Sequence, residues 1–355
     1  MEFPIFNTKE LSDGNTYDLS DPAERYKYFH AKLGTKIEDI KEYLDNNTFV
    51  GFLLAKKSAG KGTYSKLFQE VVGKDRVAHI SVGDIVRDVH RAIDDKKEHD
   101  ALADYMGKYY RGFISLDDAL DAFVNKTQDK LIPTEFILTL IKREIEKIGR
   151  KAIFVDGLPR SLDQISYSLY FRDLINFRDD PDFFALINVP ESIIDERMKF
   201  RRVCPECQTS RNIRLLPTKH VKYSTKDNAF YLVCDNPDCA GEGETRLVEK
   251  EGDDKGIELI KSRLEMDGEL INKAQELQGI PKVLLRNSIP VDVASDYAEK
   301  YELTPSFSFS VDTVGKVNVV ESPWVVKDDQ GVASHSLMAP PVVVSFISQV
   351  HNLII

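Results

Sequence analysis

Short apolar runs alternate with helical patterns along most of the chain. The first run, TFVGFLLA, covers Thr48 to Ala55. The later runs cover Val77 to Ser81, Lys151 to Val155, Phe183 to Val189 and Lys282 to Leu285. A run that is apolar at every position is typical of a strand buried on both faces. Strands that alternate with helices predict a parallel sheet covered by helices. We therefore expect an α/β fold in three layers around a five-stranded parallel sheet.

Four segments stand outside this alternation. Residues 1–46 precede the first strand and include a helical stretch from Asp21, the expected N-cap, to about Leu44. Two insertions interrupt a core of residues 47–303: a charged helical insertion, 87–149, and a region that holds all four cysteines, 203–252. Residues 304–355 follow the core, and we expect there a β-hairpin that turns at Gly315 and a final helix.

A lysine-rich loop follows the first apolar run. Its sequence, AKKSAGKGT, runs from Ala55 to Thr63 and leads into a helix. Small residues let backbone N–H groups surround a phosphate, the helix N-terminus adds its dipole, and Lys61 adds a full charge. Ala55 stands where the usual pattern has its first glycine. The loop alone therefore leaves two interpretations open, a phosphate-binding loop and a lysine-rich turn.

Composition restricts the partners that the chain is expected to bind. The 355 residues are 42% hydrophobic and 30% charged, with a net charge of -10. An acidic chain binds nucleic acid poorly, because that affinity comes from neutralising phosphates. The first 20 residues lack the apolar stretch of a signal peptide, and the apolar end from Pro341 to Ile355 is too short and too polar to span a bilayer. We expect a cytoplasmic protein that binds neither membrane nor nucleic acid, and a monomer.

The four cysteines form two closely spaced pairs. Cys204 and Cys207 enclose two residues, Cys234 and Cys239 enclose four, and 26 residues separate the pairs. Turns of this length place two thiolates on one ion, and two such turns complete a tetrahedral zinc site. Disulfides are rare in the cytoplasm, so we expect structural Zn²⁺. Four protein ligands leave no open position for catalysis, and His220 remains an alternative ligand in place of one cysteine.

Five segments together resemble the adenylate kinase family of nucleoside monophosphate kinases. The resemblance extends from Phe49 to Leu264 and leaves residues 1–46 and 304–355 outside it. The segments, in the order of the family, are GKGT at Gly60 to Thr63, SVGDIVR at Ser81 to Arg87, DGLPR at Asp156 to Arg160 with Gln164 downstream, ERMKFRR at Glu196 to Arg202, and Asp253-Asp254 with Arg263-Leu264. The resemblance implies a P-loop phosphotransferase that uses ATP, a nucleoside monophosphate and Mg²⁺, with the cysteines in a zinc-bearing lid.

The resemblance also implies a role for each residue at the ATP site. Lys61 would reach the terminal phosphates, and the rest of the loop would surround them: Ser58, Ala59, Gly60, Gly62 and Thr63. Arg197 and Arg201 would bind the phosphate chain, and Arg263 would join them. The spacing of four residues would place Arg197 and Arg201 on one helix face. A solvated basic helix face is the alternative for that pair.

At the acceptor site, the resemblance implies that Arg87 and Arg160 hold the phosphate of the monophosphate, a task that suits the bidentate guanidinium. Val82, Gly157 and Gln164 would line the rest of the site. Asp84 and Asp156 would position water on Mg²⁺, which keeps several waters when bound. Asp84 could instead be a helix N-cap, and Gln164 a surface residue.

Three departures from the family pattern affect the acceptor more than the reaction. Lys250, Glu251 and Gly252 stand where the family often has an arginine before the paired aspartates. Val82 stands where the family often has threonine, and the interval from Arg87 to Asp156 is longer than usual. AMP is the expected acceptor, and another nucleoside or deoxynucleoside monophosphate is the first alternative. The alternative from another class is a non-catalytic nucleotide-binding module with a zinc ribbon.

Overall fold

Five parallel strands form the central sheet. The computed structural model describes residues 3–92, 94–124, 133–160, 164–165 and 180–355. In order across the sheet, the strands are β10 (Lys282–Arg286), β4 (Asp182–Asn188), β1 (Val50–Ala55), β3 (Ala152–Asp156) and β2 (Val77–Ser81). Every neighbouring pair is parallel. The prediction of an α/β fold around a five-stranded parallel sheet is confirmed.

The central strand shows why its sequence is apolar throughout. All six residues of β1 are buried, because alternate side chains enter the cores on opposite faces of the sheet. Leu53 packs in one core and Phe52 in the other. Gly51 leaves space for aromatic rings: a Cβ there would lie 2.9 Å from atoms of both Phe154 and Phe183.

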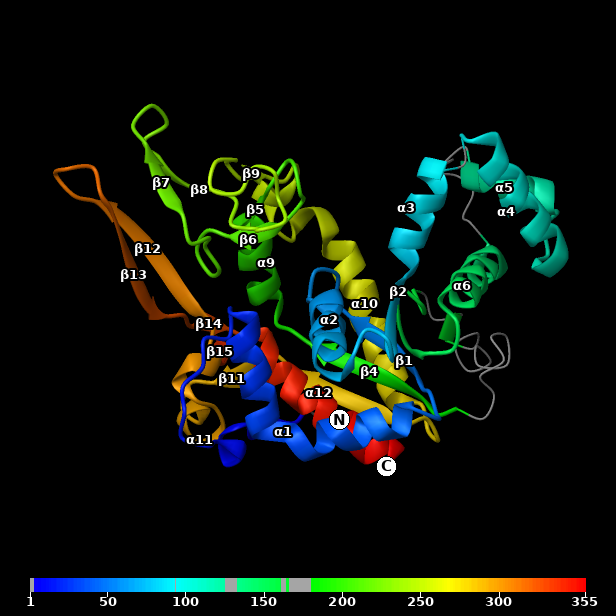
Figure 1. The fold of residues 1–355 in the computed structure, drawn as a ribbon, viewed down its shortest axis with the longest axis horizontal. Helices are drawn as coiled ribbons and strands as arrows, with labels where there is room; N and C mark the ends of the chain where they lie inside the picture. The colour runs from blue at the N-terminus through cyan, green and yellow to red at the C-terminus, as the bar shows by residue number, and fades with distance from the viewer. Residues whose placement is uncertain (1–2, 93, 125–132, 161–163, 166–179) are drawn as a thin grey trace.

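Helices cover both faces of the sheet (Figure 1). One layer contains α1 (Pro22–Leu44), α2 (Lys61–Val72) and α12 (Ala339–Ile354), and their buried residues share one core cluster. The other layer contains α6 (Thr134–Ile148) and α10 (Lys261–Glu276). Helix α1 begins where the sequence predicted, since the Asp21 side chain accepts hydrogen bonds from the backbone N–H groups of Ala23 and Glu24. No helix of the described ranges combines the length and apolarity needed to cross a bilayer.

Two groups of elements project from the carboxyl ends of the strands (Figure 1). Helix α3 (Val82–Ala92) leads into the helical insertion, which contributes α4 (Lys96–Tyr109) and α5 (Leu116–Val124). These three helices pack with α6 around a small core of their own. Helix α9 (Glu191–Lys199) leads into the cysteine region, residues 203–252. Five short strands follow α9, the first of which begins just before the cysteine region. They are β5 (Arg201–Val203), β6 (Ser210–Asn212), β7 (Val221–Ser224), β8 (Ala229–Leu232) and β9 (Val248–Glu249).

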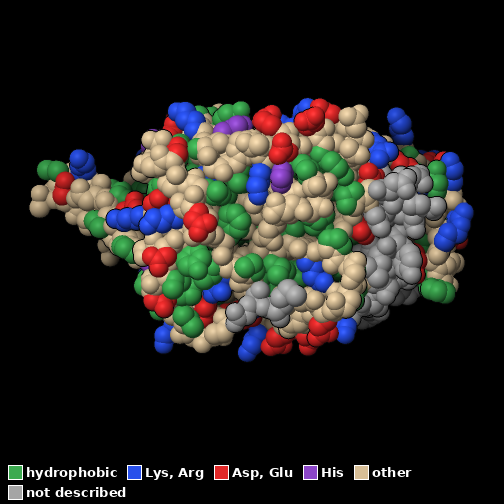
Figure 2. Space-filling model, turned by 90° about the horizontal axis from the view of Figure 1, so that it is seen from below, with side chains coloured by type: hydrophobic (Ala, Val, Ile, Leu, Met, Phe, Trp, Pro, Cys, Tyr) green, Lys and Arg blue, Asp and Glu red, His purple; other side chains and the backbone are tan. Residues whose placement is uncertain are grey.

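The chain between β10 and α12 forms several short strands and a short helix. It contains β11 (Ser288–Pro290), α11 (Ala294–Tyr297), β12 (Pro305–Val311), β13 (Val317–Pro323), β14 (Val326–Lys327) and β15 (Ala333–Ser336). Strands β12 and β13 form an antiparallel hairpin that turns through Gly315 at a positive φ of 86°. The hairpin projects from one end of the molecule (Figure 1). Seen from below, the surface of the molecule shows acidic and basic side chains interspersed (Figure 2).

The hairpin contacts the cysteine region. The backbone N–H of Phe307 donates a hydrogen bond of 2.7 Å to the carbonyl oxygen of Arg214. The ring of Phe309 lies 5.6 Å from that of Phe230 on β8, centroid to centroid. A polar and an aromatic contact therefore join two segments that are distant in sequence.

A buried carboxylate connects the two ends of the chain. Glu302 is fully buried, and its carboxylate accepts hydrogen bonds from Tyr28 (2.6 Å), Thr8 (2.7 Å) and the backbone N–H of Glu299 (2.7 Å). The ammonium of Lys32, itself buried, lies 3.3 Å away. Burial raises the pKa of Tyr28 well above its usual value, with the Glu302 charge adding to the effect. The phenol is therefore a neutral donor.

Replacing Glu302 should destabilise the protein strongly. Glu302→Ala leaves the Lys32 ammonium buried without its counter-charge, and breaking a buried ion pair in this way costs about 3–5 kcal/mol. Calorimetry should show a clear fall in Tm, whereas Glu321→Ala, on the exposed part of β13, should change the unfolding free energy by less than about 0.5 kcal/mol. Equal stability of the two variants would contradict this account of the network.

Candidate active site

The phosphate loop joins the end of β1 to the start of α2. Gly60 precedes the helix with a φ of 98°, and the Lys61 ammonium donates a hydrogen bond of 3.0 Å to the carbonyl oxygen of Ala55. It also lies 3.8 Å from the carboxylate of Asp156, at the end of the adjacent strand β3. The Lys61 side chain therefore lies against the backbone of its own loop.

Ser58 adopts a backbone conformation that normally favours glycine. Its φ is 65°, and a left-handed conformation costs an L-residue about 1–2 kcal/mol. Three contacts hold this part of the loop. The backbone N–H of Lys57 donates to the buried carboxylate of Asp267 at 2.8 Å. The Lys56 ammonium contacts Glu191 at 2.8 Å and Asp329 at 3.0 Å.

The other residues predicted for the phosphate loop lie just before α2 or in its first turn. Ala59 is buried, Gly62 is half-buried and Thr63 is exposed. The backbone N–H of Thr63 donates to the carbonyl oxygen of Gly60 at 2.9 Å, which closes the first helical turn. The remaining N–H groups of this turn are available to an anion, since the first residues of a helix have no intrahelical partner.

Arg87 and Arg160 converge on one point. A Cβ at Gly83 would lie 3.3 Å from Nη1 of Arg87 and 3.5 Å from Nη2 of Arg160. A Cβ at Gly157, whose φ is 91°, would lie 3.1 Å from the same Arg160 nitrogen. Two glycines therefore leave the space in which the guanidinium groups approach each other, and Arg263 is near enough to donate a 3.5 Å hydrogen bond to the Arg160 carbonyl oxygen.

The positive charges at this point are incompletely compensated. Arg87 pairs with Asp84, but the ion pairs among the described residues include none to Arg160. Although part of the Arg160 side chain is open to solvent, desolvation of its guanidinium and the charge of Arg263 lower its pKa. An anion placed between the guanidinium groups would relieve this repulsion.

The other residues that the sequence predicts for the acceptor and magnesium sites lie nearby. Gln164 accepts a hydrogen bond of 2.8 Å from the backbone N–H of Arg160 and donates one of 3.0 Å to Thr134. Val82 is buried and would lie 3.3 Å from a Cβ at Gly157. Asp84 is exposed, and it is not an N-cap because α3 begins two residues earlier.

The expectation that Arg197 and Arg201 share a helix face is wrong. Helix α9 ends at Lys199, and Arg201 begins strand β5. Arg197 donates hydrogen bonds to Asn287 (3.2 Å) and Ser336 (3.3 Å). Arg201 instead forms a two-point ion pair with Asp253, at 2.6 and 2.7 Å. The two arginines are separated because Arg201 already belongs to β5, which pairs with β6 and β9 of the cysteine region and so cannot continue the helix.

The last arginine of the predicted set, Arg263, pairs with Asp267 one turn along α10, at 2.9 Å. Asp267 is the residue that also accepts from the backbone of Lys57. One carboxylate therefore links this arginine to the phosphate loop.

Sequence reasoning did not identify the anionic and polar partners of these cations. Asp253, which the resemblance places only within the fifth family segment, is buried against Arg201. The others are Asp267, Glu191, Asp329, Asn287 and Ser336. Only Asp267 had a local signal, because it follows Arg263 by four residues on a helix.

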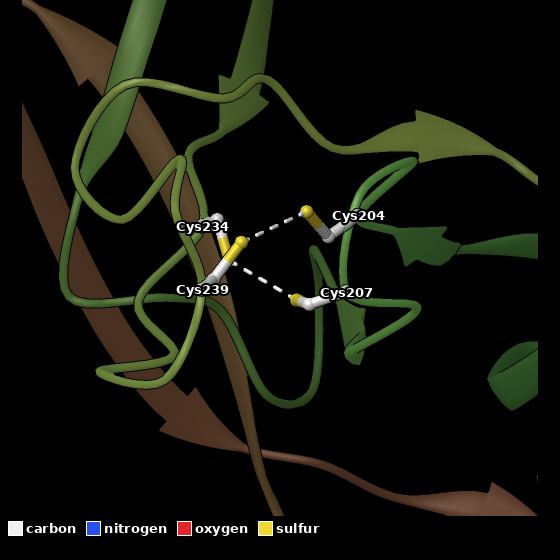
Figure 3. A group of neighbouring side chains, drawn as sticks. All are labelled: Cys204, Cys207, Cys234 and Cys239. Atoms are coloured by element: carbon white, nitrogen blue, oxygen red, sulfur yellow. Dashed lines mark hydrogen bonds between the residues drawn. The ribbon is translucent and has the colours of Figure 1, made fainter.

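The side chains of the four cysteines point toward one another (Figure 3). Their sulfur atoms all lie within 4.8 Å of one another, with 3.9 Å between Cys204 and Cys239 and 3.7 Å between Cys207 and Cys234. No disulfide joins them. Hydrogen bonding with Thr209 lowers the pKa of Cys207 to about 5, while burial raises that of Cys234 to about 12. Four converging sulfur atoms fit a tetrahedral thiolate site, in which a cation would stabilise all four as thiolates.

The class of protein follows from the fold and the loop. A parallel sheet whose central strand leads through a glycine–lysine loop into a helix, with charged side chains at the carboxyl ends of the strands, defines a P-loop nucleotide-binding enzyme. Strand β1 is that central strand, and Lys61 begins the helix.

Comparison with known proteins identifies the family. The chain is 31% identical to an adenylate kinase of Thermotoga petrophila over 201 residues, which cover 56% of this chain and 72% of the relative. It is 29% identical to that of Thermotoga neapolitana over 247 residues, 69% and 92% of the two chains. For Clostridium tetani the identity is 32% over 215 residues, 60% and 79%. No protein-family model matches the chain. The chain belongs to the adenylate kinase family of nucleoside monophosphate kinases.

Proposed function

We propose that this enzyme transfers the γ-phosphoryl group of ATP to AMP and so forms two molecules of ADP. The observation that carries the proposal is the adjacency, across Asp156 and Gly157, of the glycine–lysine loop and the converging Arg87 and Arg160. Asp156 contacts Lys61 of the phosphate loop, and Gly157 leaves space for Arg160. A donor phosphate at the loop and an acceptor phosphate between Arg87 and Arg160 would therefore meet, and positioning of this kind is the main requirement of phosphoryl transfer.

The proposed reaction forms one phosphorus–oxygen bond and breaks another. A phosphate oxygen of AMP attacks the γ-phosphorus of ATP, the bond from that phosphorus to the β–γ bridging oxygen breaks, and ADP leaves. Lys61, Arg197, Arg201 and Arg263 stabilise the negative charge on the transferred group and the leaving phosphate. For Arg201 and Arg263 this requires that they exchange Asp253 and Asp267 for phosphate oxygens.

Magnesium fits the same site. Mg²⁺ bound with ATP supplies further positive charge at the phosphate oxygens. Asp84 and Asp156 would orient its waters, and both carboxylates lie beside cationic side chains of the two phosphate sites. Carboxylates that act through water suit an ion that dehydrates reluctantly.

In our proposal, each region of the chain has a separate role in phosphoryl transfer. Residues 47–303 form the kinase core, the helical insertion of residues 87–149 binds the acceptor, and the cysteine region is the lid. Arg197, Arg201 and Arg263 flank the cysteine region in sequence, which supports a role for it in arranging them over the phosphates. The additions of residues 1–46 and 304–355 contact one another, as the 2.9 Å approach of His351 to Asp39 illustrates. Residues 1–46 also contact the core through the Glu302 network.

Two other functions would use parts of the same structure. Another nucleoside or deoxynucleoside monophosphate as acceptor is compatible with the buried Val82 beside the site. A nucleotide-binding module without catalysis would need the phosphate loop and the cysteine region. The converging Arg87 and Arg160 favour catalysis over that alternative, because a binder of ATP needs no second phosphate site.

Lys61→Ala should abolish most turnover and leave the fold intact. Removing the charge at the transferred phosphoryl group should lower kcat by about 10²–10³-fold. Coupled assays of ADP formation with AMP, GMP, CMP, UMP and their deoxy forms would test both the reaction and the acceptor. Lys66→Ala, on the exposed face of α2, is the control and should retain activity. Wild-type kcat in Lys61→Ala would remove the loop from the mechanism.

Arg87→Ala and Arg160→Ala should each raise KM for the monophosphate by about tenfold or more while changing KM for ATP little. Each removes charge-assisted hydrogen bonds, worth about 1.5–3 kcal/mol. Arg91→Ala is the matched control, since Arg91 lies on α3 and pairs with Asp88 at the surface. Equal weakening of both nucleotides would show that these arginines do not define an acceptor site.

The purified protein should contain about one zinc ion per chain, as one four-thiolate site requires. We propose that this ion stabilises the cysteine region and takes no part in the chemistry. Cys204→Ser with Cys207→Ser should increase hydrogen exchange within residues 203–252 while the sheet remains protected, and ATP should still bind. Loss of all nucleotide binding, or unchanged protection of the region, would contradict a local structural role.

A further inference from the structure

A short turn near the C-terminus reaches the phosphate loop. This C-terminal turn, residues 327–331, connects β14 to β15. Asp328 is buried and stabilises the turn, because its carboxylate accepts from the backbone N–H groups of Gln330 (3.0 Å) and Val332 (2.9 Å). Strands β14 and β15 pair on either side of it. The turn is thus a defined structure and not a loose connection.

The next residue, Asp329, contacts two elements of the donor site at once. One carboxylate oxygen accepts a hydrogen bond of 2.7 Å from the backbone N–H of Glu191, the first residue of α9. The other lies 3.0 Å from the ammonium of Lys56 in the phosphate loop. A third contact reinforces the pair, since the Ser192 hydroxyl donates to the carbonyl oxygen of Lys327 at 2.6 Å.

The Lys56 ammonium is held by carboxylates on two sides. Desolvation alone would lower the pKa of Lys56, but its hydrogen bonds to Glu191 and Asp329 outweigh that effect and raise it above the usual value. Lys56 therefore remains charged and directed away from its own loop.

We infer that Asp329 is a positioning residue for the donor site, which fixes the phosphate loop relative to helix α9. The inference rests on the proposed function and adds to it a role for a segment outside the region of family resemblance. Lys61 lies five residues beyond Lys56 in the loop, and Arg197 lies six residues beyond Glu191 on the helix. Asp329 sets the separation of the two elements that carry these donor-site cations.

The test begins with Asp329→Asn, which keeps an acceptor for the backbone of Glu191 and removes the charge that holds Lys56. Isothermal titration should show a rise of about three- to tenfold in the Kd for ATP, the effect of losing one charge-assisted contact. KM for AMP should change less than twofold. Asp312→Asn is the matched control, because Asp312 caps the distant hairpin turn of the same segment.

A double-mutant cycle separates positioning from general stability. Lys56→Met should weaken ATP binding at least as much, because it also removes the contact with Glu191. Lys56→Met with Asp329→Asn should be no worse than Lys56→Met alone, since the contact between Lys56 and Asp329 is already lost in that variant. Asp329→Glu should recover part of the affinity. If Asp329→Asn does not fold, Lys56→Met and Asp329→Glu test the same contact.

Three results would overturn the inference. They are unchanged ATP affinity in Asp329→Asn, additive effects in the cycle, and tighter ATP binding when Lys56 is released. ATP binding is measured directly, so these results are independent of turnover. A wild-type protein that binds ATP but phosphorylates none of the monophosphates would contradict the proposed function and leave the binding cycle informative.

Discussion

The guanidinium groups of Arg87, Arg160 and Arg263 lie close enough to repel one another, and the candidate active site depends on how its positive charges are balanced. Lys61 lies near Asp156, Arg201 pairs with Asp253, and Arg263 pairs with Asp267. Arg87 and Lys56 have their own carboxylates. An acidic protein, with a net charge of -10, can supply these counter-charges locally. Bound nucleotides would replace several of them, because phosphate oxygens form the same charge-assisted hydrogen bonds.

The residues that contact these cationic side chains come from distant parts of the chain. Helix α10 supplies Asp267 to both Arg263 and the phosphate loop, and the segment before α12 supplies Ser336 to Arg197 and Asp329 to Lys56. The same C-terminal segment contacts the cysteine region through Phe309. Residues outside the family resemblance thus contact the phosphate loop, helix α9 and the lid that we propose, while the buried Glu302 attaches the segment to α1.

The sheet was predictable from the sequence because its inner strands are buried on both faces and are therefore largely apolar, as in β1. The edge strands β2 and β10 are only partly buried but keep short apolar runs. The loop was recognisable from Gly60 and Lys61, and the two cysteine pairs from their spacing. The partners of the cations were not predictable. Asp329 lies 273 residues from Lys56, and Asp253 lies 52 residues from Arg201. Contacts at such separations leave no periodic signal, and the end of α9 before Arg201 depends on strand pairing in the cysteine region.

The central claim is direct transfer between two adjacent phosphate sites, and isotope transfer tests it most directly. ATP labelled with ³²P at its γ-phosphoryl group would be mixed with unlabelled AMP and the enzyme, and the products separated after a single turnover. The account predicts that the label appears as the β-phosphoryl group of the ADP formed from AMP, because both phosphates occupy the site together. Label found mainly as inorganic phosphate, with AMP unchanged, would contradict it.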